Sequence, residues 1–368
     1  MTGGTTTTVR RVDVSVVPSS SATRIVLEIV VPQSVPASQR PARRRSLVAA
    51  VLATALLLAA CGTDDGAASG QDPTASPDAS DSTNLNVAIA SFDIAVGQDQ
   101  RLLAGLLSDQ RDLLAHGEVT FQLGFLGDEP GGETELTQEV TASFLGIPGG
   151  EPEGDHPTPR FLEGPGNGVY TARVDLDQPG NWGLRVVAEL EDGRVLEGQA
   201  VFPVLEEPLV PAVGDPAPRT ENPTIADAEA GRVEPAAIDS RAGGTDGTIP
   251  DPQLHDAVIA DLLAAGEPFV VAITTPVYCV SRFCGPLTNV LADMALDRED
   301  ELTFVHLEVW EDHGEAAVNP AAAEWILPAE GADGREPWVF VVDGDGIITA
   351  RWDNVLDLEE FEAALDAL

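Results

Sequence analysis

The sequence predicts a two-domain chain in which an antiparallel β-sandwich is followed by an α/β domain. Residues 84–205 contain about seven short alternating segments separated by turn residues, whereas continuous apolar strands and helical patterns begin only after residue 252. Between these regions, residues 206–252 are rich in Pro, Gly, Asp and Glu, which indicates a linker and an entry segment. The chain has 368 residues, 43% of them apolar, and can therefore fill two cores.

The charge of the chain excludes one class of function. All 20 basic residues are Arg, the chain contains no Lys, and 61 acidic residues bring the formal net charge to −41. Nucleic-acid readers bind phosphates through clustered basic side chains, so we expect no nucleic-acid partner. We interpret the acidic, Lys-free composition as a solvated surface suited to a saline environment.

An export signal precedes the predicted domains. Residues 40–60 carry four Arg followed by a run of small and aliphatic residues that is too short to span a bilayer. The end of this run, Leu58-Ala59-Ala60-Cys61, resembles the lipobox of bacterial lipoproteins. The resemblance implies cleavage before Cys61, a lipid attached to its sulfur, and a location at the extracytoplasmic face of the cell membrane. An ordinary signal peptide with an incidental cysteine is the alternative.

Two segments flank this signal. Residues 61–83 are rich in Gly, Ser, Asp and Pro without apolar periodicity, which predicts a flexible tether. Residues 1–39 are an unexplained extension, because a signal normally begins at the N-terminus. We interpret this extension as a mis-called start or as a real segment of unknown role, and we exclude it from the predicted fold.

Each predicted strand of residues 84–205 is a short run in which apolar and polar residues alternate. The runs are LNVAIAS, RLLAGLL, VTFQLGFL, TASFLGI, GVYTARVDL, WGLRVVAEL and RVLEGQAVFPV. Such alternation places every second side chain in the core. The segment GVYTARVDLDQPGNWGLRVVAEL resembles the closing hairpin of immunoglobulin-like modules in the FixH/YtkA and CopC-like group. The resemblance implies an immunoglobulin-like sandwich, and no metal-ligand set accompanies it.

Strands and helices alternate after residue 252. PFVVAITT at 268–275 is a continuous apolar run and therefore a buried strand, and residues 286–297 follow a helical pattern. The next elements are the strand LTFVHLEV, the helix NPAAAEWIL, the hairpin of PWVFVVD and IITARWD, and a last helix with a capping box of Asp357 and Glu360. This order predicts a small mixed sheet flanked by helices.

Two cysteines lie between the first strand and the first helix of this region. Cys284-Gly285-Pro286 stands at the start of the helix, and Cys279 precedes it with a Cys-x4-Cys spacing. This arrangement resembles the thioredoxin fold and its TlpA-like and peroxiredoxin-like relatives, over residues 213–368. The resemblance implies an α/β thioredoxin-like domain with a redox-active cysteine pair.

Two further segments carry the same resemblance. GDPAP at 214–218 is similar to the opening of the exported relatives, and Glu336-Pro337 stands where the family places a cis-proline beside its active site. The resemblance therefore adds Pro337 to the site. The chain departs from the thioredoxin pattern at Leu287, because thioredoxins have their second cysteine at that position.

The spacing of the two thiols restricts how they can pair. Residues at i and i+5 point about 140° apart on a helix, so a disulfide between Cys279 and Cys284 requires one of them to lie in the preceding loop. A helix N-terminus favours the thiolate, which is the attacking species. We therefore expect Cys284 to be the nucleophile and Cys279 the resolving cysteine, with the reversed roles as one alternative. A fixed disulfide in a redox-inert domain is another.

Together these observations predict a membrane-anchored, extracytoplasmic thiol-disulfide oxidoreductase that uses no cofactor. Its partners would be protein thiols or a membrane redox protein that resets the cysteine pair. The first alternative is a Sco-like copper chaperone, in which Cys279, Cys284 and His306, or His313 as another third ligand, would bind Cu(I). The second is a redox-inert protein whose sandwich binds a partner. Serine-hydrolase, phosphate-loop and zinc interpretations have no support, because the sequence contains neither a G-x-S-x-G nor a G-x4-G-K-[ST] pattern and no His pair at metal-ligand spacing.

Overall fold

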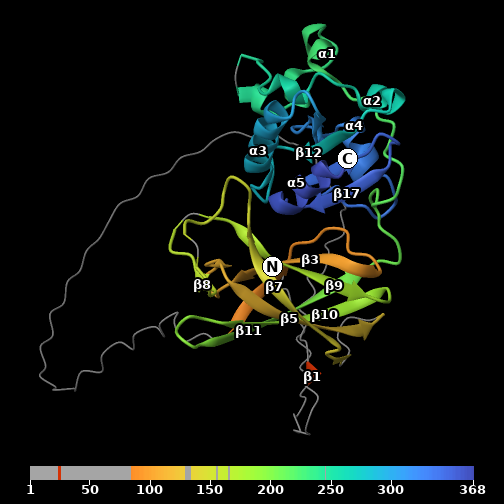
Figure 1. Cartoon of the computed structure of the whole chain (residues 1–368). Coiled ribbons are helices and arrows are strands. Elements are labelled where there is room, and N and C mark those ends of the chain that lie inside the picture. The colour runs from red at the N-terminus through yellow and green to blue at the C-terminus, as the bar shows by residue number, and fades with distance from the viewer. Residues whose placement is uncertain (1–23, 26–83, 129–133, 155, 165, 245) are drawn as a thin grey trace, which may run out of the picture. The chain divides into compact units, whose positions relative to one another are not determined.

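The computed structural model describes residues 24–25, 84–128, 134–154, 156–164, 166–244 and 246–368. Its two largest sheets are a closed barrel of seven strands and a mixed sheet of four strands with several helices around it (Figure 1). Both sheets belong to one compact unit, which contains residues 82–368.

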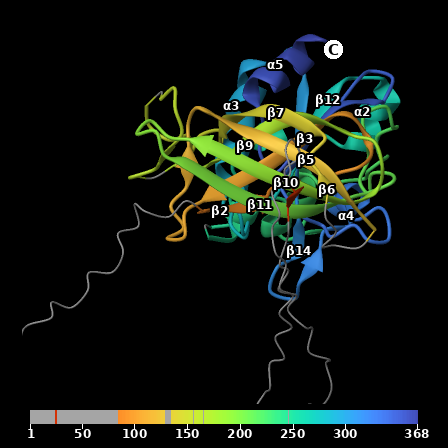
Figure 2. The same cartoon turned by 90° about the horizontal axis from the view of Figure 1, so that it is seen from below.

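The barrel is formed by the strands of residues 84–204. Its strand order is β10-β11-β2-β3-β9-β7-β5, and the barrel closes because β5 also pairs with β10. The pair of β11 and β2 is parallel, and the other neighbours are antiparallel (Figure 2). The strands are β2 (Asn84–Ile89), β3 (Gly97–Leu107), β5 (Glu118–Gly127), β7 (Gln138–Gly146), β9 (Gly168–Leu176), β10 (Gly180–Glu189) and β11 (Val195–Val204).

Every second side chain of the strands points into the barrel, and these side chains fill its interior. In β5, Val119, Phe121 and Leu123 are buried at every second position, as a strand with one inner face requires. Glycine matters where β11 meets β2, because a Cβ atom at Gly198 would lie 2.5 Å from the backbone oxygen of Leu85. The close parallel pairing of these two strands therefore depends on the missing side chain.

The predicted fold class is wrong. The seven alternating runs do form strands, but these strands close into one barrel instead of stacking as an immunoglobulin-like sandwich, and only 19% of the structure is helical. The combination of an antiparallel sandwich with an α/β thioredoxin-like domain therefore does not describe this chain. The cause is the ladder between β10 and β5, which runs from Asn181 opposite Gly127 to Val187 opposite Thr120 and joins what would be two separate sheet edges.

The second large sheet lies in the carboxy-terminal half and has the order β13-β12-β16-β17. Strand β13 is parallel to β12, whereas β16 is antiparallel to both β12 and β17. Its strands are β12 (Phe269–Thr274), β13 (Thr303–Glu308), β16 (Trp338–Val342) and β17 (Ile348–Asp353). The α-helices of this half are α1 (Ile225–Glu229), α2 (Ile259–Ala265), α3 (Cys284–Asp297), α4 (Pro320–Ile326) and α5 (Leu358–Asp366).

Short elements complete the described chain. The 3-10 helices are η2 (Pro235–Ala237), η3 (Ser240–Gly244) and η4 (Pro252–Leu254), and the small strands are β1 (Arg24–Ile25), β4 (Leu114–Ala115), β6 (Thr134–Glu135), β8 (Arg160–Phe161), β14 (Trp310–Asp312) and β15 (Ala317–Val318). Strand β1 pairs with β6 and belongs to the extension 1–39 that sequence analysis left outside the fold.

The strands and helices predicted after residue 252 are present, and both faces of the central strand are buried. Val271 of β12 belongs to the buried cluster of Trp325 in α4, whereas its neighbour Val270 belongs to the cluster of Leu291 in α3 and Phe361 in α5. Because helices cover both faces of β12, this strand reads as a continuous apolar run.

Buried polar contacts join the barrel to the four-stranded sheet. Arg101 of β3 forms an ion pair with Asp353 at the end of β17, with 3.3 Å between Nη1 and Oδ1, and the two side chains are only 9% and 12% exposed. The Asp353 carboxylate also accepts a hydrogen bond from the backbone N–H of Phe92, and Asn354 Nδ2 donates to the carbonyl of Ala90. The segment between β2 and β3 is thus fixed to the end of β17.

Candidate redox site

A disulfide joins Cys279 and Cys284, with 6.0 Å between their Cα atoms. Cys284 is the first residue of α3, and Cys279 lies in the loop that follows β12. The loop is held by backbone hydrogen bonds from Cys279 N–H to the Thr275 carbonyl and from Arg282 N–H to the Cys279 carbonyl. The sequence prediction that one cysteine lies at the helix entrance and the other in the loop is confirmed.

The two sulfurs differ in exposure. Cys284 is fully buried, whereas Cys279 is half-buried in a loop whose neighbouring residue Val280 is 94% exposed. In thiol-disulfide exchange, the attacking sulfur approaches along the axis of the disulfide bond that breaks, so the reacting cysteine sulfur must be accessible to the substrate. Only Cys279 is therefore accessible to a substrate in this arrangement.

Hydrogen-bond donors also gather at Cys279. The backbone N–H of Cys284, at the N-terminus of α3, points at Cys279 Sγ at 3.4 Å, and the hydroxyl of Ser281 lies 3.2 Å from the same sulfur. Donors and the positive end of a helix dipole both favour a thiolate over a thiol. Sequence reasoning assigned the benefit of the helix N-terminus to Cys284, and the structure shows that the donors face Cys279.

Glu336 and Pro337 complete the site. The peptide bond between them is cis, as the resemblance implied for Pro337. One carboxylate oxygen of Glu336 and the two sulfurs all lie within 4.8 Å of one another. Burial raises the pKa of Glu336, and the neighbouring Glu308 acts in the same direction, so that the pKa is about 7. In the sequence, this carboxylate is distinguished only by its position directly before the expected cis-proline.

A cavity of about 630 Å³ borders the reactive loop. Ser281 and Phe283 line it on one side, and Ala88, Gly105 and Val169 of the barrel line it on the other. Neither cysteine lines this cavity, and its link to the disulfide is Ser281, whose hydroxyl lies 3.2 Å from Cys279 Sγ.

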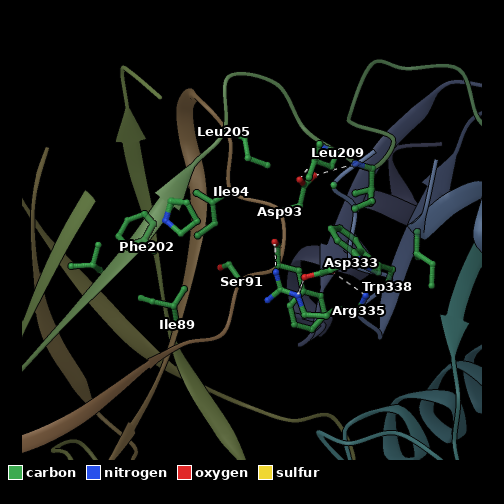
Figure 3. Close-up of a pocket in the computed structure, with 17 residues that line it drawn as sticks. Ile89, Ser91, Asp93, Ile94, Phe202, Leu205, Leu209, Asp333, Arg335 and Trp338 are labelled. Carbon is green, nitrogen blue, oxygen red and sulfur yellow. Dashed lines mark hydrogen bonds and ion pairs between the residues drawn. The ribbon is translucent and has the colours of Figure 1, made fainter. Parts of the chain in front are cut away.

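A smaller cavity of about 330 Å³ is lined by Arg335 and Trp338, which flank the Glu336-Pro337 bond in the sequence (Figure 3). Ile94 and Phe202 line it from the barrel, and Arg335 and Trp338 line it from the segment around the cis bond. The Arg335 guanidinium stacks over the Phe92 ring at 4.7 Å. Neither cysteine nor Glu336 is among the residues that line this cavity.

His306 lies in a different cluster from the cysteines. Its Nδ1 is 3.8 Å from Asp239 Oδ2, and His255 Nε2 is 3.4 Å from the same oxygen. Burial lowers the pKa of His306 to about 3, although Asp239 opposes the shift. Burial raises the pKa of Asp239, but His255 and Arg241 outweigh it and hold that pKa well below its usual range.

The copper interpretation depended on His306 as third ligand. Among the described residues, the group of possible ligands around Cys279 and Cys284 is completed by Glu336 and not by His306. His313, the other histidine considered, stacks on the ring of Tyr278 with 3.9 Å between centroids. The possible ligand atoms at this position are therefore the two cysteine sulfurs and a carboxylate oxygen of Glu336.

Several sequence predictions fall outside the described residues. These are the lipid-carrying Cys61, the signal peptide 40–60, the tether 61–83 and all of the extension 1–39 except β1. Across the part of the chain that the structure describes, no helix has the length and apolar character needed to cross a membrane.

Comparison of the chain with protein-family models, with curated proteins and with solved structures finds no match.

Proposed function

We propose that the chain is a thiol-disulfide oxidoreductase in which Cys279 is the attacking cysteine and Cys284 the resolving cysteine. The observation that carries this proposal is the asymmetry of the pair. Cys279 Sγ is the accessible sulfur and receives the hydrogen bonds of Ser281 and the α3 N-terminus, whereas Cys284 is fully buried. This order reverses the one favoured from the sequence.

The reaction consists of two exchanges. The Cys279 thiolate attacks one sulfur of a substrate disulfide, so that a mixed disulfide forms and the other substrate sulfur leaves as a thiolate. Cys284 then loses its proton and attacks Cys279 Sγ, which closes the protein disulfide and releases the second substrate thiolate. The substrate gains two electrons, and the cysteine pair loses two. A dithiol protein would restore the reduced pair by the same steps in reverse.

Glu336 supports the proposal because the second exchange requires a proton acceptor. Its carboxylate lies close to both sulfurs, so it can take the proton of the Cys284 thiol and pass it to the departing substrate thiolate. A partly buried carboxyl group with a pKa near neutrality suits this task, because it can both accept and release a proton at pH 7.

The substrate class proposed is protein disulfides or thiols outside the cytoplasm. Val277 and Val280 are exposed apolar side chains beside Cys279, and such residues suit contact with an unfolded or extended chain. The lipobox-like sequence ending at Cys61 supports a membrane anchor and an extracytoplasmic location. No cofactor enters the proposed reaction.

The test uses the full chain with Cys61→Ala, which leaves Cys279 and Cys284 as its only cysteines. After reduction, each variant is mixed with a chromogenic aromatic disulfide, and the released aromatic thiolate is counted. The unmodified pair should release two thiolates per chain, because Cys284 resolves the mixed disulfide. Cys284→Ser should release one and remain as a mixed disulfide, detectable as an added mass on Cys279.

Cys279→Ser provides the matched comparison. Because the remaining sulfur is buried, we expect its reaction to be at least about 100-fold slower than that of Cys284→Ser. Equal rates in the two variants would overturn the assigned order. A pair that resists reduction by dithiothreitol in the folded chain would identify a fixed disulfide and refute the oxidoreductase.

A further inference from the structure

A second cluster of polar side chains lies in the interior of the carboxy-terminal half. Asp239 lies between η2 and η3, His255 directly follows η4, and His306 is in the middle of β13. All three side chains have no exposed surface. The two histidines are far apart in the sequence, which is why no metal-ligand spacing was found there.

The geometry of the cluster matches a small cation. One ligand atom from each of the three residues lies within 4.8 Å of the others, with 3.4 Å from Asp239 Oδ2 to His255 Nε2 and 3.8 Å to His306 Nδ1. Ligands about 2.0–2.2 Å from a tetrahedral zinc ion are roughly 3.3–3.5 Å apart. The donors therefore surround a point at which an ion could bind after a small contraction.

Hydrogen bonding determines which ring nitrogen of His306 carries the proton. The Thr288 hydroxyl donates to the Cys284 carbonyl, so the Thr274 hydroxyl must donate its own proton to Thr288 Oγ1. Thr274 Oγ1 can then only accept from His306 Nε2, which lies 2.8 Å away, and the Thr274 carbonyl at 3.2 Å is also an acceptor. His306 Nε2 consequently carries the proton.

In the neutral His306 ring, Nδ1 therefore carries no proton and directs its lone pair toward Asp239 Oδ2. Both of these atoms are hydrogen-bond acceptors, so no hydrogen bond forms between them. Within the described residues, His306 Nδ1 and both ring nitrogens of His255 are buried without a hydrogen-bond partner. A buried polar atom left without a partner has lost its hydrogen bonds to water without replacing them, which is unfavourable. A cation between the three residues would satisfy an orphaned nitrogen on each ring.

The surrounding charges also favour a divalent cation. Asp239 and Asp251 are both paired with Arg241. Two carboxylates thus accompany one guanidinium. Arg241 binds Asp239 through both oxygens, but a carboxylate has lone pairs for further ligands.

We infer that Asp239, His255 and His306 form a buried binding site for a divalent transition metal ion, with zinc as the best match to two imidazole nitrogens and one carboxylate oxygen. Because the donors are closed off from solvent, the ion would stabilise the fold, with a buried water molecule in the fourth tetrahedral position. It would fix the segment that contains η2 to η4 against β13. The site is independent of the proposed thiol chemistry.

The test uses the purified full chain with its disulfide closed and Cys61→Ala, so that no thiol competes for metal. After treatment with a chelator and dialysis, the chain is titrated with zinc, and bound metal is measured by mass spectrometry. We expect one tightly bound zinc per chain. Cobalt in its place should give the visible absorption of a tetrahedral nitrogen and oxygen site, which reports on the ligands independently of stability.

Variants assign the site. His255→Gln and His306→Gln should each weaken zinc binding by about 100-fold or more, whereas the exposed His313→Gln should leave it unchanged. Asp239→Asn keeps the side-chain shape and should also lose the cobalt spectrum while the far-ultraviolet circular dichroism stays that of the parent. Absence of stoichiometric zinc in the folded parent, or binding unaffected by His255→Gln, would overturn the inference.

Discussion

Replacing Glu336 by Gln tests the proposed proton transfer most directly. Gln keeps the size of the side chain but cannot accept the proton of Cys284. Without that acceptor the second exchange depends on thiolate already present, and a thiol of pKa about 8.5 is roughly 3% ionised at pH 7. Glu336, with a pKa of about 7, is itself only half ionised at pH 7, so we expect the resolving step to be about 15-fold slower in Glu336→Gln at that pH.

The pH dependence carries more information than a single rate. Burial, reinforced by Glu308, raises the pKa of Glu336 to about 7, so the acceptor form becomes available as the pH rises through that value. The parent rate should rise to a plateau above pH 7. The rate of Glu336→Gln should continue to rise beyond pH 8.5, and the two should differ less than about 2-fold at pH 9.5.

Single-turnover kinetics can separate this step from the first exchange. The mixed disulfide at Cys279 is formed with a fluorescent thiol in acid, the pH is raised by rapid mixing, and release of the fluorophore is followed. Glu330→Gln changes an exposed carboxylate nearby in the sequence and should behave as the parent. A Glu336→Gln profile that superimposes on that of the parent would refute the role of this carboxylate.

Three predictions concern stability. Arg101→Ala leaves the buried carboxylate of Asp353 unpaired and should lower the free energy of unfolding by about 3 kcal/mol, measured by urea denaturation and partly restored by adding Asp353→Asn. Gly198→Val places a side chain against the backbone oxygen of Leu85 and should cost about 1–3 kcal/mol in the same assay. The raised pKa of Glu336 means that the folded chain binds its proton more tightly than the unfolded chain does, so stability should fall as the pH rises from about 4.5 to 7, and the fall should be smaller in Glu336→Gln.

The positions of the strands could be predicted from the sequence, but their closure could not. Alternation along VTFQLGFL identifies Phe121 and Leu123 as core residues in either a sandwich or a barrel, because both architectures have one inner face. What distinguishes them is the pairing of Asn181–Val187 with residues 120–127, which no local pattern records. After residue 252 the sequence patterns predicted the elements more fully. A strand such as β12, whose two faces are both covered by helices, is a continuous apolar run in the sequence.

The candidate site was predicted in part for similar reasons. Cys279, Cys284 and Pro337 were identified because their spacing and neighbours form a motif. Glu336 was missed as a functional group because its importance comes from its distance to the sulfurs, which only the fold supplies. The pairing of His255 with His306 was missed because it joins distant segments through the tertiary structure.

The contact between Arg101 and Asp353 also determines how the chain would unfold. If the barrel opened while the four-stranded sheet stayed intact, the carboxylate of Asp353 would lose its partner. If the four-stranded sheet opened while the barrel stayed intact, the guanidinium of Arg101 would lose its partner. Either partial state is therefore penalised, which favours one cooperative transition for both sheets. It follows that a ligand bound to the barrel would also protect the reactive loop against unfolding, although the two lie in different sheets.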